Sequence, residues 1–237
     1  MIIFDYGHTL LYEPNHNRTN ANRKIYKYIA KNPQNISFEE FDRTVNDIFV
    51  QVREKSGENI EIHEHSILKM AYEYMGIELS ISMEEAERVI WEGISKGAVM
   101  PYADEMIDYL NSIGMRTAVI SNLCFSGNAL KERLNRLLPN NNFEFVITSS
   151  DYVFKKPNSL LFEIAVRKAG LPSDKIWYCG DSIKNDIYGA HGVGIFPVLY
   201  EGKNDERVPE FEKTNKGYEI DFEYLHIHDW RELIGIL

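Results

Sequence analysis

The residues best suited to chemistry lie where short apolar runs end. Asp5 follows the apolar residues 1–4 and precedes a turn that contains a glycine. We interpret this run as a buried strand that ends in a carboxylate. A carboxylate in this position costs free energy unless a metal ion, a phosphate or hydrogen bonds compensate it. Asp5 is therefore predicted to act in ligand binding, although an aspartate that only caps a turn gives the same pattern.

Polar side chains also follow three later apolar runs. They are Ser121 with Asn122, the segment before Lys156, and Asp181. In an open parallel sheet the carboxyl ends of the strands lie at one edge, where ligands bind. Two carboxylates, a hydroxyl and an ammonium group that meet at such an edge are typical of a site for a metal-bound phosphate.

Each of these side chains has a predicted role. Asp5 and Asp181 are expected to bind a hard cation such as Mg²⁺, which binds together with a substrate phosphate. Ser121 is expected to donate a hydrogen bond to a phosphate oxygen, and Lys156 to offset the phosphate charge. Asp186, five residues after Asp181, is expected to complete the cation site by orienting metal-bound water.

The spacing of apolar residues indicates two kinds of architecture. Residues 15–97 contain four amphipathic helical patterns and no convincing strand, which predicts a small helical bundle. Two of the patterns begin at capping-box spacings, Ser37 to Glu40 and Ser82 to Glu85. From residue 101 onward helical and strand patterns alternate, which predicts a doubly wound parallel α/β sheet.

The predicted organisation is therefore an α/β core with an inserted cap. The core comprises residues 1–14 and 98–237, and a four-helix cap at residues 15–97 covers the carboxyl edge of the sheet. The first cap helix is expected to end near Asn32, and residues 201–217 are expected to form a polar loop.

Composition limits the classes of partner. The chain has 237 residues and a formal charge of −10, from 26 basic and 36 acidic residues. This balance gives no support to nucleic-acid or anionic-membrane binding, which require basic surfaces. No signal peptide and no membrane-length apolar run is visible, and Cys124 and Cys179 form no metal-type or redox-type pair, so a cytoplasmic protein is expected. The oligomeric state stays open.

Four motifs, in order along the chain, resemble those of a known superfamily. Residues 4–10 resemble the first motif of the haloacid dehalogenase superfamily and residues 119–122 the second. Residues 156–157 resemble the third, and residues 180–186 the fourth. The chain is identified as a member of this superfamily with a helical cap of the type that follows the first motif. The resemblance implies a Rossmann-like core and hydrolase activity.

The resemblance also implies a role for each motif residue. Asp5 would be the nucleophile that forms an aspartyl-phosphate, and Gly7 would offer its backbone carbonyl to Mg²⁺. Ser121 and Asn122 would hold the phosphate, and Lys156 would neutralise charge on the transferring group. The implied activity is a Mg²⁺-dependent phosphohydrolase that acts on a small phosphorylated metabolite.

The chain departs from the family pattern at position 7. Phosphatases of the family usually have a second aspartate there, which carries a proton to the leaving group, whereas this chain has Gly7. Such proton transfer is typically worth about 100- to 10,000-fold in rate. One alternative is that His8 carries the proton, because imidazole titrates near neutrality. Another is that the substrate has a good leaving group that needs little protonation. Alternatively, the protein binds phosphate ligands with little turnover and has a regulatory role.

Two specialised groups within the family depart from the phosphatase motifs. The dehalogenases of the family lack the Gly-Asp pair of the fourth motif, so Gly180 and Asp181 argue against halide chemistry. Phosphonate-cleaving relatives also lack the second aspartate but use a cap lysine to form an imine with the substrate. A phosphonatase-like reaction therefore stays as an alternative, with four cap lysines as candidates: Lys24, Lys27, Lys55 and Lys69.

Two pairs of histidines are not expected to bind metal. His63 and His65 are two residues apart, so on a helix they would face different directions and form a solvated helix start. His226 and His228 could share one face of a strand, but the sequence offers no further ligand near them.

Overall fold

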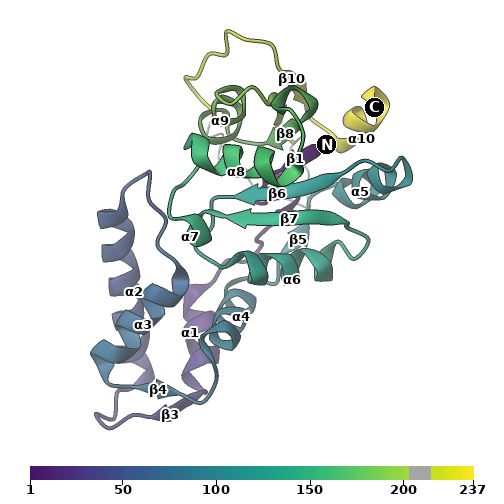
Figure 1. Cartoon of the computed structure of the whole chain (residues 1–237). Coiled ribbons are helices and arrows are strands. Elements are labelled where there is room, and N and C mark those ends of the chain that lie inside the picture. The colour runs from purple at the N-terminus through teal and green to yellow at the C-terminus, as the bar shows by residue number, and fades with distance from the viewer. Residues whose placement is uncertain (203–214) are drawn as a thin grey trace.

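A six-stranded parallel sheet forms the centre of the computed structural model, which describes residues 1–202 and 215–237 (Figure 1). The strand order is β10-β9-β8-β1-β6-β7. These strands are β1 (Ile2–Phe4), β6 (Thr117–Ser121), β7 (Phe143–Thr148), β8 (Trp177–Gly180), β9 (Phe196–Tyr200) and β10 (Leu225–Ile227). The predicted doubly wound α/β fold is therefore confirmed.

Both faces of the sheet are covered because the strand side chains alternate in direction. In β1, Phe4 packs into one apolar cluster together with residues of α5 (Ala103–Ser112), α6 (Gly127–Leu137) and α10 (Trp230–Ile236). Ile3 packs into a second cluster together with residues of α8 (Ser159–Ala169) and α9 (Tyr188–His191). Since neighbouring residues of a strand point to opposite faces, a continuous apolar strand can support helices on both sides.

Three short helical turns complete the core. They are α7 (Ser149–Tyr152), the 3₁₀ turn η1 (Ser173–Lys175) and the π-helical turn η2 (Ile183–Ile187). The α7 turn follows β7 directly, and η2 follows β8 after two residues. Both turns therefore lie at the carboxyl edge of the sheet, where they place loops beside the strand ends.

Four helices between β2 (Leu11–Tyr12) and β5 (Ala98–Val99) form a separate layer beside that edge (Figure 1). They are α1 (Arg18–Tyr26), α2 (Phe38–Ser56), α3 (Glu64–Met75) and α4 (Met83–Ile94). Ser37 caps α2 by accepting from the backbone N–H of Glu40 at 3.2 Å, and both bonds of a capping box are present at Ser82 and Glu85. The helices start where the capping-box spacing predicts.

Close packing joins the first and last of these helices. A Cβ atom added at Gly93 in α4 would lie 2.5 Å from the Cα atom of Ala21 in α1. Any side chain at position 93 would therefore push the two helices apart, which explains a glycine in the middle of a helical pattern.

The prediction of a helix as far as Asn32 and of no strand in this region is wrong. Helix α1 ends at Tyr26, and β3 (Ile29–Lys31) pairs antiparallel with β4 (Glu78–Leu79). The Asn32 side chain then closes a turn, because it accepts from the backbone N–H of Ile36 at 2.8 Å. The helical spacing of apolar residues continues past Tyr26, but pairing of β3 with the distant strand β4 determines the structure there.

The chain leaves and re-enters the core at one place. Leu11 in β2 pairs with Val99 in β5, so the two connections to the helical layer run side by side. One apolar cluster continues from Phe4 in the sheet to Trp91 and Phe41 in the helical layer. Buried apolar side chains therefore continue without interruption across the proposed boundary. The division into an α/β core and a cap at residues 15–97 stays a prediction.

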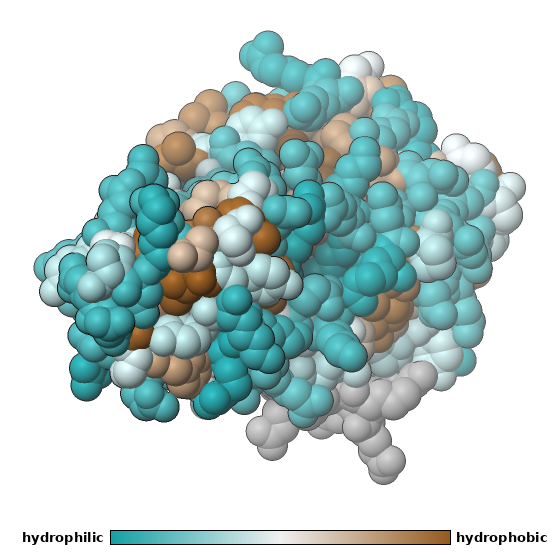
Figure 2. All heavy atoms as spheres, turned by 90° about the horizontal axis from the view of Figure 1, so that it is seen from below, coloured by the Kyte–Doolittle hydropathy of each residue, from teal (hydrophilic) through white to brown (hydrophobic). Residues whose placement is uncertain are grey.

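The surface agrees with the acidic, polar composition. Figure 2 shows a largely hydrophilic face on which hydrophobic residues form small areas separated by hydrophilic ones. Among the helices of residues 1–202 and 215–237, none is both long and apolar enough to cross a membrane. Most of the predicted polar loop at residues 201–217 lies outside the described residues.

Candidate active site

Three strands end side by side in candidate site residues. Because β1 pairs in parallel with both β6 and β8, Asp5, Ser121 and Asp181 leave the sheet at the same edge. The backbone N–H of Asp5 donates to the carbonyl oxygen of Cys179 at 2.8 Å, which anchors the start of the turn. The register of the sheet thus brings together residues that are far apart in the sequence.

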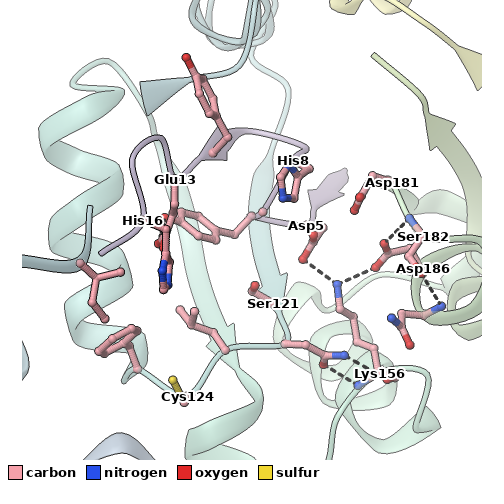
Figure 3. Close-up of a pocket in the computed structure, with 18 of the residues that line it drawn as sticks. Asp5, His8, Glu13, His16, Ser121, Cys124, Lys156, Asp181, Ser182 and Asp186 are labelled. Carbon is pink, nitrogen blue, oxygen red and sulfur yellow. Dashed lines mark hydrogen bonds and ion pairs between the residues drawn. The ribbon is translucent and has the colours of Figure 1, made fainter. Parts of the chain in front are cut away.

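Lys156 links two of the carboxylates. Its ammonium group donates to Asp5 Oδ1 at 2.7 Å and to Asp186 Oδ1 at 2.6 Å (Figure 3). Lys156 is only 3% exposed. Burial alone would lower the pKa of Lys156, but attraction to Asp186 and Asp5 outweighs burial and raises this pKa above its usual value. The buried ammonium group therefore stays charged.

Two further residues hold Lys156 in place. The hydroxyl of Tyr178 accepts from Lys156 Nζ at 2.9 Å and lies 3.0 Å from the carbonyl oxygen of Ile120, to which it can donate. The side-chain oxygen of Asn122 accepts from the backbone N–H of Lys156 at 2.7 Å, and the Asn122 amide donates to the Lys156 carbonyl at 3.1 Å. The Asn122 side chain therefore orients the Lys156 backbone, and its predicted contact with phosphate stays a prediction.

Tyr178 is a site residue that the sequence pattern did not predict. This residue lies in the middle of an apolar strand pattern, where an aromatic residue is expected to serve packing alone. Only the neighbouring strand β6 and the loop before α8 reveal that its hydroxyl faces Lys156.

Three carboxylates lie close together at this edge. Asp5, Asp181 and Asp186 each place an oxygen atom within 4.8 Å of the others. Burial raises the pKa of Asp5 to about 6, and burial together with repulsion from Asp186 and Asp5 raises the pKa of Asp181 well above its usual value. One lysine cannot balance three ionised carboxylates, so two negative charges remain without compensation. This is the condition that favours a divalent cation.

The donor set fits Mg²⁺. It consists of carboxylate oxygens, and Gly7, whose carbonyl was predicted to contact the cation, lines the same cavity. Hard oxygen donors are those that Mg²⁺ prefers. The oxygens of Asp186 are already held, Oδ1 by Lys156 and Oδ2 by the backbone N–H of Ser182 at 3.0 Å. Asp186 is therefore better placed to orient a ligand than to be the main one.

The glycine before Asp181 makes room for this arrangement. A Cβ atom added at Gly180 would lie 2.3 Å from Cγ of Asp186. Because this distance is far below van der Waals contact, any larger residue would displace the Asp186 carboxylate and its bond to Lys156.

A cavity of about 560 Å³ opens from these residues toward the helical layer. Figure 3 shows Asp5, Ser121, Lys156, Asp181 and Asp186 around one end of this cavity. The wall also includes residues from the helical layer and its connection, namely Tyr12, Glu13, His16, Arg18, Phe49, Arg53 and Ile94. Its size is typical of a small-molecule site.

Gly7 and His8 both line the cavity. A Cβ atom added at Gly7 would meet no other atom within 4 Å, so a larger side chain has room there. His8 has a positive φ of 56°, and burial lowers its pKa. A neutral imidazole next to the cavity can accept a proton but is a weak source of one near neutral pH.

Both histidine predictions need correction. His63 lies outside helix α3 as its N-cap, with extended backbone, so its ring lies 4.4 Å from the ring of His65. Glu87 joins them with Oε2 at 3.1 Å from His65 Nε2. The start of the helix is only partly solvated, because Glu64 is fully buried while His63 and His65 are half-buried and Ser66 is exposed.

The second histidine pair also has an acidic neighbour. Oε2 of Glu201 lies 3.1 Å from Nε2 of His226, and Nδ1 of His228 lies 2.9 Å from the Glu201 carbonyl oxygen. The prediction that no further ligand lies nearby is therefore wrong. One ring nitrogen of each histidine, Nε2 of His226 and Nδ1 of His228, nevertheless already contacts a protein oxygen.

A parallel α/β sheet carries three carboxylates and a buried lysine at its carboxyl edge, and four helices are inserted between β2 and β5 beside this edge. These features define the class of a parallel α/β fold with a helical insertion and a ligand site at the strand ends. The chain belongs to the family of haloacid dehalogenase-like hydrolases, whose family model matches residues 2–199. The superfamily assignment made from the four motifs is therefore confirmed.

Similar proteins agree with this assignment. The haloacid dehalogenase-like hydrolase domain-containing protein 3 of Xenopus laevis is 27% identical over 145 residues, which are 60% of this chain and 58% of that protein. A glyceraldehyde 3-phosphate phosphatase of Methanopyrus kandleri is 32% identical over 47% of this chain and 52% of that protein. The match thus spans just over half the length of both relatives.

A solved structure shows the same fold along the whole chain. The crystal structure of a HAD phosphatase from Thermococcus onnurineus matches 99% of this chain and 96% of that one, with a TM-score of 0.59 and 19% identity. At this identity the likeness describes the fold alone.

Proposed function

We propose that the chain is a Mg²⁺-dependent phosphohydrolase of a small phosphorylated metabolite. The observation that supports this best is the buried Lys156, which joins Asp5 and Asp186 beside Asp181 at one end of a cavity. Family membership supports hydrolysis, and a relative named glyceraldehyde 3-phosphate phosphatase supports a phosphorylated substrate.

In the proposed reaction the Asp5 carboxylate attacks phosphorus and the bond to the leaving oxygen breaks. The resulting aspartyl-phosphate is then cleaved by water. Ser121 donates to a phosphate oxygen, and Lys156 holds Asp5 and offsets the phosphate charge. Asp5, Asp181 and the Gly7 carbonyl would hold Mg²⁺, with Asp186 behind them. When bound, Mg²⁺ supplies the positive charge that balances these carboxylates and the phosphate.

The absence of an aspartate at position 7 favours substrates with good leaving groups. An acyl or anomeric phosphate needs little protonation, and burial keeps His8 neutral, which makes it a poor acid. His8 as the proton carrier is therefore the second choice.

A phosphonatase-like reaction receives no support from the cavity. Among the lining residues of the described chain, Lys156 is the only lysine, and Asp5 and Asp186 hold it as an ammonium group. An imine-forming lysine must instead be neutral and reach the substrate.

The experiment is a panel of phosphorylated metabolites assayed with Mg²⁺ and with a chelator, using Asp5→Asn as the inactive control. We expect Mg²⁺-dependent release of phosphate and a phosphorylated peptide that contains Asp5. Aryl phosphates of graded leaving-group acidity then test the leaving-group argument, and a rate that is independent of leaving group would overturn it. A protein that binds phosphate esters but never forms the phosphorylated peptide would be a regulatory phosphate-binding protein.

A further inference from the structure

The wall of the cavity contains two arginines that the proposed hydrolysis does not use. Arg18 begins helix α1 and Arg53 lies in the last turn of α2, and both line the cavity together with Phe49. The Arg18 guanidinium carbon lies 3.4 Å from the centroid of the Phe49 ring, and that of Arg53 lies 5.2 Å from it. One aromatic ring therefore packs against both cations.

Each arginine is held from behind by a buried glutamate. Arg18 Nη2 donates to Glu64 Oε1 at 2.8 Å, and Arg53 Nη1 donates to Glu61 Oε1 at 2.8 Å. Glu64 and Glu61 are 0% and 4% exposed, and neither lines the cavity. Both arginines thus line the cavity, whereas the glutamates that balance their charges lie behind its wall.

These pairs leave hydrogen-bonding capacity unused. A guanidinium group has five N–H donors, and each arginine uses one of them on its glutamate. Arg18 Nε and Glu64 Oε2 are buried and have no partner within the described residues. A buried polar group without a partner costs free energy, so its presence in a native structure calls for an explanation.

Stability alone is a weak explanation for the pairs. Replacing a buried ion pair by apolar residues is often neutral or stabilising, because burial of the charges removes their hydration. Two such pairs side by side on a cavity wall, stacked on one ring, instead form a rigid array of donors. A guanidinium group can donate two parallel hydrogen bonds to two oxygens of a carboxylate or a phosphate.

We propose that Arg18 and Arg53 bind a second anionic group of the substrate, a carboxylate or a second phosphate, while its scissile phosphate lies at Asp5. This inference rests on the proposed phosphohydrolase function, and it narrows the substrates to phosphorylated acids or bisphosphates. The cavity of about 560 Å³ reaches from the sheet edge to both arginines.

Two matched pairs of substrates test the proposal. In the first pair, 3-phosphoglycerate and glyceraldehyde 3-phosphate differ by a carboxylate in place of an aldehyde. In the second pair, ribulose 1,5-bisphosphate and ribulose 5-phosphate differ by a terminal phosphate in place of a hydroxyl. The expected result is a kcat/KM about tenfold or more higher for the member with a second anionic group in at least one pair, and the pair that shows it identifies the group.

The variant Arg18→Gln combined with Glu64→Gln removes both charges but keeps a hydrogen-bonding pair, so that no buried carboxylate is left alone. We expect it to lower kcat/KM for the preferred substrate with two anionic groups about 10- to 100-fold. Hydrolysis of p-nitrophenyl phosphate, which lacks a second anion, should change less than threefold. The matched control is Arg23→Gln, because Arg23 is also in α1 and stacks at 4.2 Å on a phenylalanine, Phe38, but does not line the cavity.

Arg53→Gln is the second variant, should the double variant fail to fold. Equal kcat/KM within both pairs, or losses in these variants that are the same for p-nitrophenyl phosphate, would overturn the second-anion site. If wild-type protein hydrolyses nothing, the phosphohydrolase proposal fails separately. Calorimetric binding of the same four compounds then decides. Tighter binding of a member with a second anionic group supports the site, and equal binding excludes it.

Discussion

Lys156 determines the electrostatic balance of the site. Removing it by Lys156→Ala leaves Asp5 and Asp186 buried without a counter-ion, which typically costs about 3–5 kcal/mol. We expect loss of activity and a lower free energy of unfolding at pH 7.5, measured by urea titration. The loss should shrink toward pH 5, because protonation of Asp5, whose pKa is raised by burial, removes the cost of its buried charge.

The control for this variant is Lys184→Ala. Lys184 also pairs with a carboxylate, Glu58 at 2.6 Å, but both side chains are exposed. Exposed pairs contribute little, so its unfolding free energy should stay nearly unchanged. A similar loss in both variants would contradict a special role for Lys156.

Gly7 offers a gain-of-function test. The variant Gly7→Asp has room for its side chain, because no atom lies within 4 Å of the added Cβ. We expect it to increase the hydrolysis of alkyl phosphates about 100-fold or more, since a carboxylic acid at this place can protonate a poor leaving group. Hydrolysis of acyl phosphates, measured in parallel, should change little. Equal effects on both substrate types would show that proton transfer is not what the chain lacks.

Binding of Mg²⁺ should stabilise the folded protein. The pKa values of Asp5 and Asp181 are raised by burial, so the folded protein binds more protons than the unfolded chain. It loses stability as the pH rises through these raised values, which for Asp5 is about 6. A cation replaces those protons, and at 100 times its Kd it adds about 2.7 kcal/mol. The thermal unfolding temperature with Mg²⁺ and with a chelator should therefore differ more at pH 7.5 than at pH 5.

Asp181→Asn is the matched variant for this measurement. It removes one carboxylate, so the protein without metal should be more stable than wild type at pH 7.5. At the same time its response to Mg²⁺ should be smaller. A Mg²⁺ response as large as that of wild type would place the cation elsewhere.

At the scale of elements, the start of α3 and the turn α7 form a contact that depends on pH. His63 Nε2 lies 3.7 Å from Asp151 Oδ1, and Glu64, Glu87 and His65 also face His63. Interaction with Asp151 raises the pKa of His63 above 6.5. Burial raises the pKa of Asp151, but the His63 interaction and a hydrogen bond from a backbone N–H outweigh it, and the net shift is downward from 3.8.

The sign of both shifts defines the pH range of this contact. Because the pKa of His63 is raised, the stabilisation of the folded protein by His63 is complete below pH 6.5. It is lost as the pH rises through the pKa of His63 in the folded protein. Because the pKa of Asp151 is lowered, the stabilisation of the folded protein by Asp151 is present above pH 3.8 and is lost in stronger acid. A double-mutant cycle of His63→Gln and Asp151→Asn should therefore give a coupling energy at pH 5.5 that vanishes by pH 9. A coupling that does not change with pH would exclude the ion pair.

For the whole molecule, the continuous apolar core predicts cooperative unfolding. Trp91 of the helical layer stacks at 4.4 Å on Phe125, which precedes α6, while Trp230 packs at 5.6 Å against Phe4 in the sheet. Both tryptophans belong to one cluster of buried side chains. Loss of either part therefore exposes apolar surface of the other, and a single transition is expected.

Fluorinated tryptophan provides the measurement without mutation. The chain has three tryptophans, so ¹⁹F resonances of the labelled protein report on the helical layer through Trp91 and on the core through Trp177 and Trp230. Their unfolding midpoints in urea should coincide. Midpoints that differ by more than the width of the transition would show that residues 15–97 unfold as an independent domain.

The sequence alone was sufficient for the features that depend on local order. The alternation of apolar strands and amphipathic helices predicted the parallel sheet. Burial makes this possible, because it gives apolar residues a regular spacing along each helix and strand. It also placed Asp5, Ser121 and Asp181 at strand ends, and parallel strands necessarily end at one edge. Capping residues such as Ser82 predicted where helices begin, because their hydrogen bonds span only three residues.

Other features required the folded chain, because they depend on contacts between segments that have no fixed spacing. The pairing of β3 with β4 ended a helix that local spacing would have continued. The hydroxyl of Tyr178 and the amide of Asn122 gained their contacts with Lys156 only when β6, β8 and a loop came together. Arg18 and Arg53 are ordinary helix residues in sequence, and packing of α1 and α2 against the cavity is what directs their charges to it.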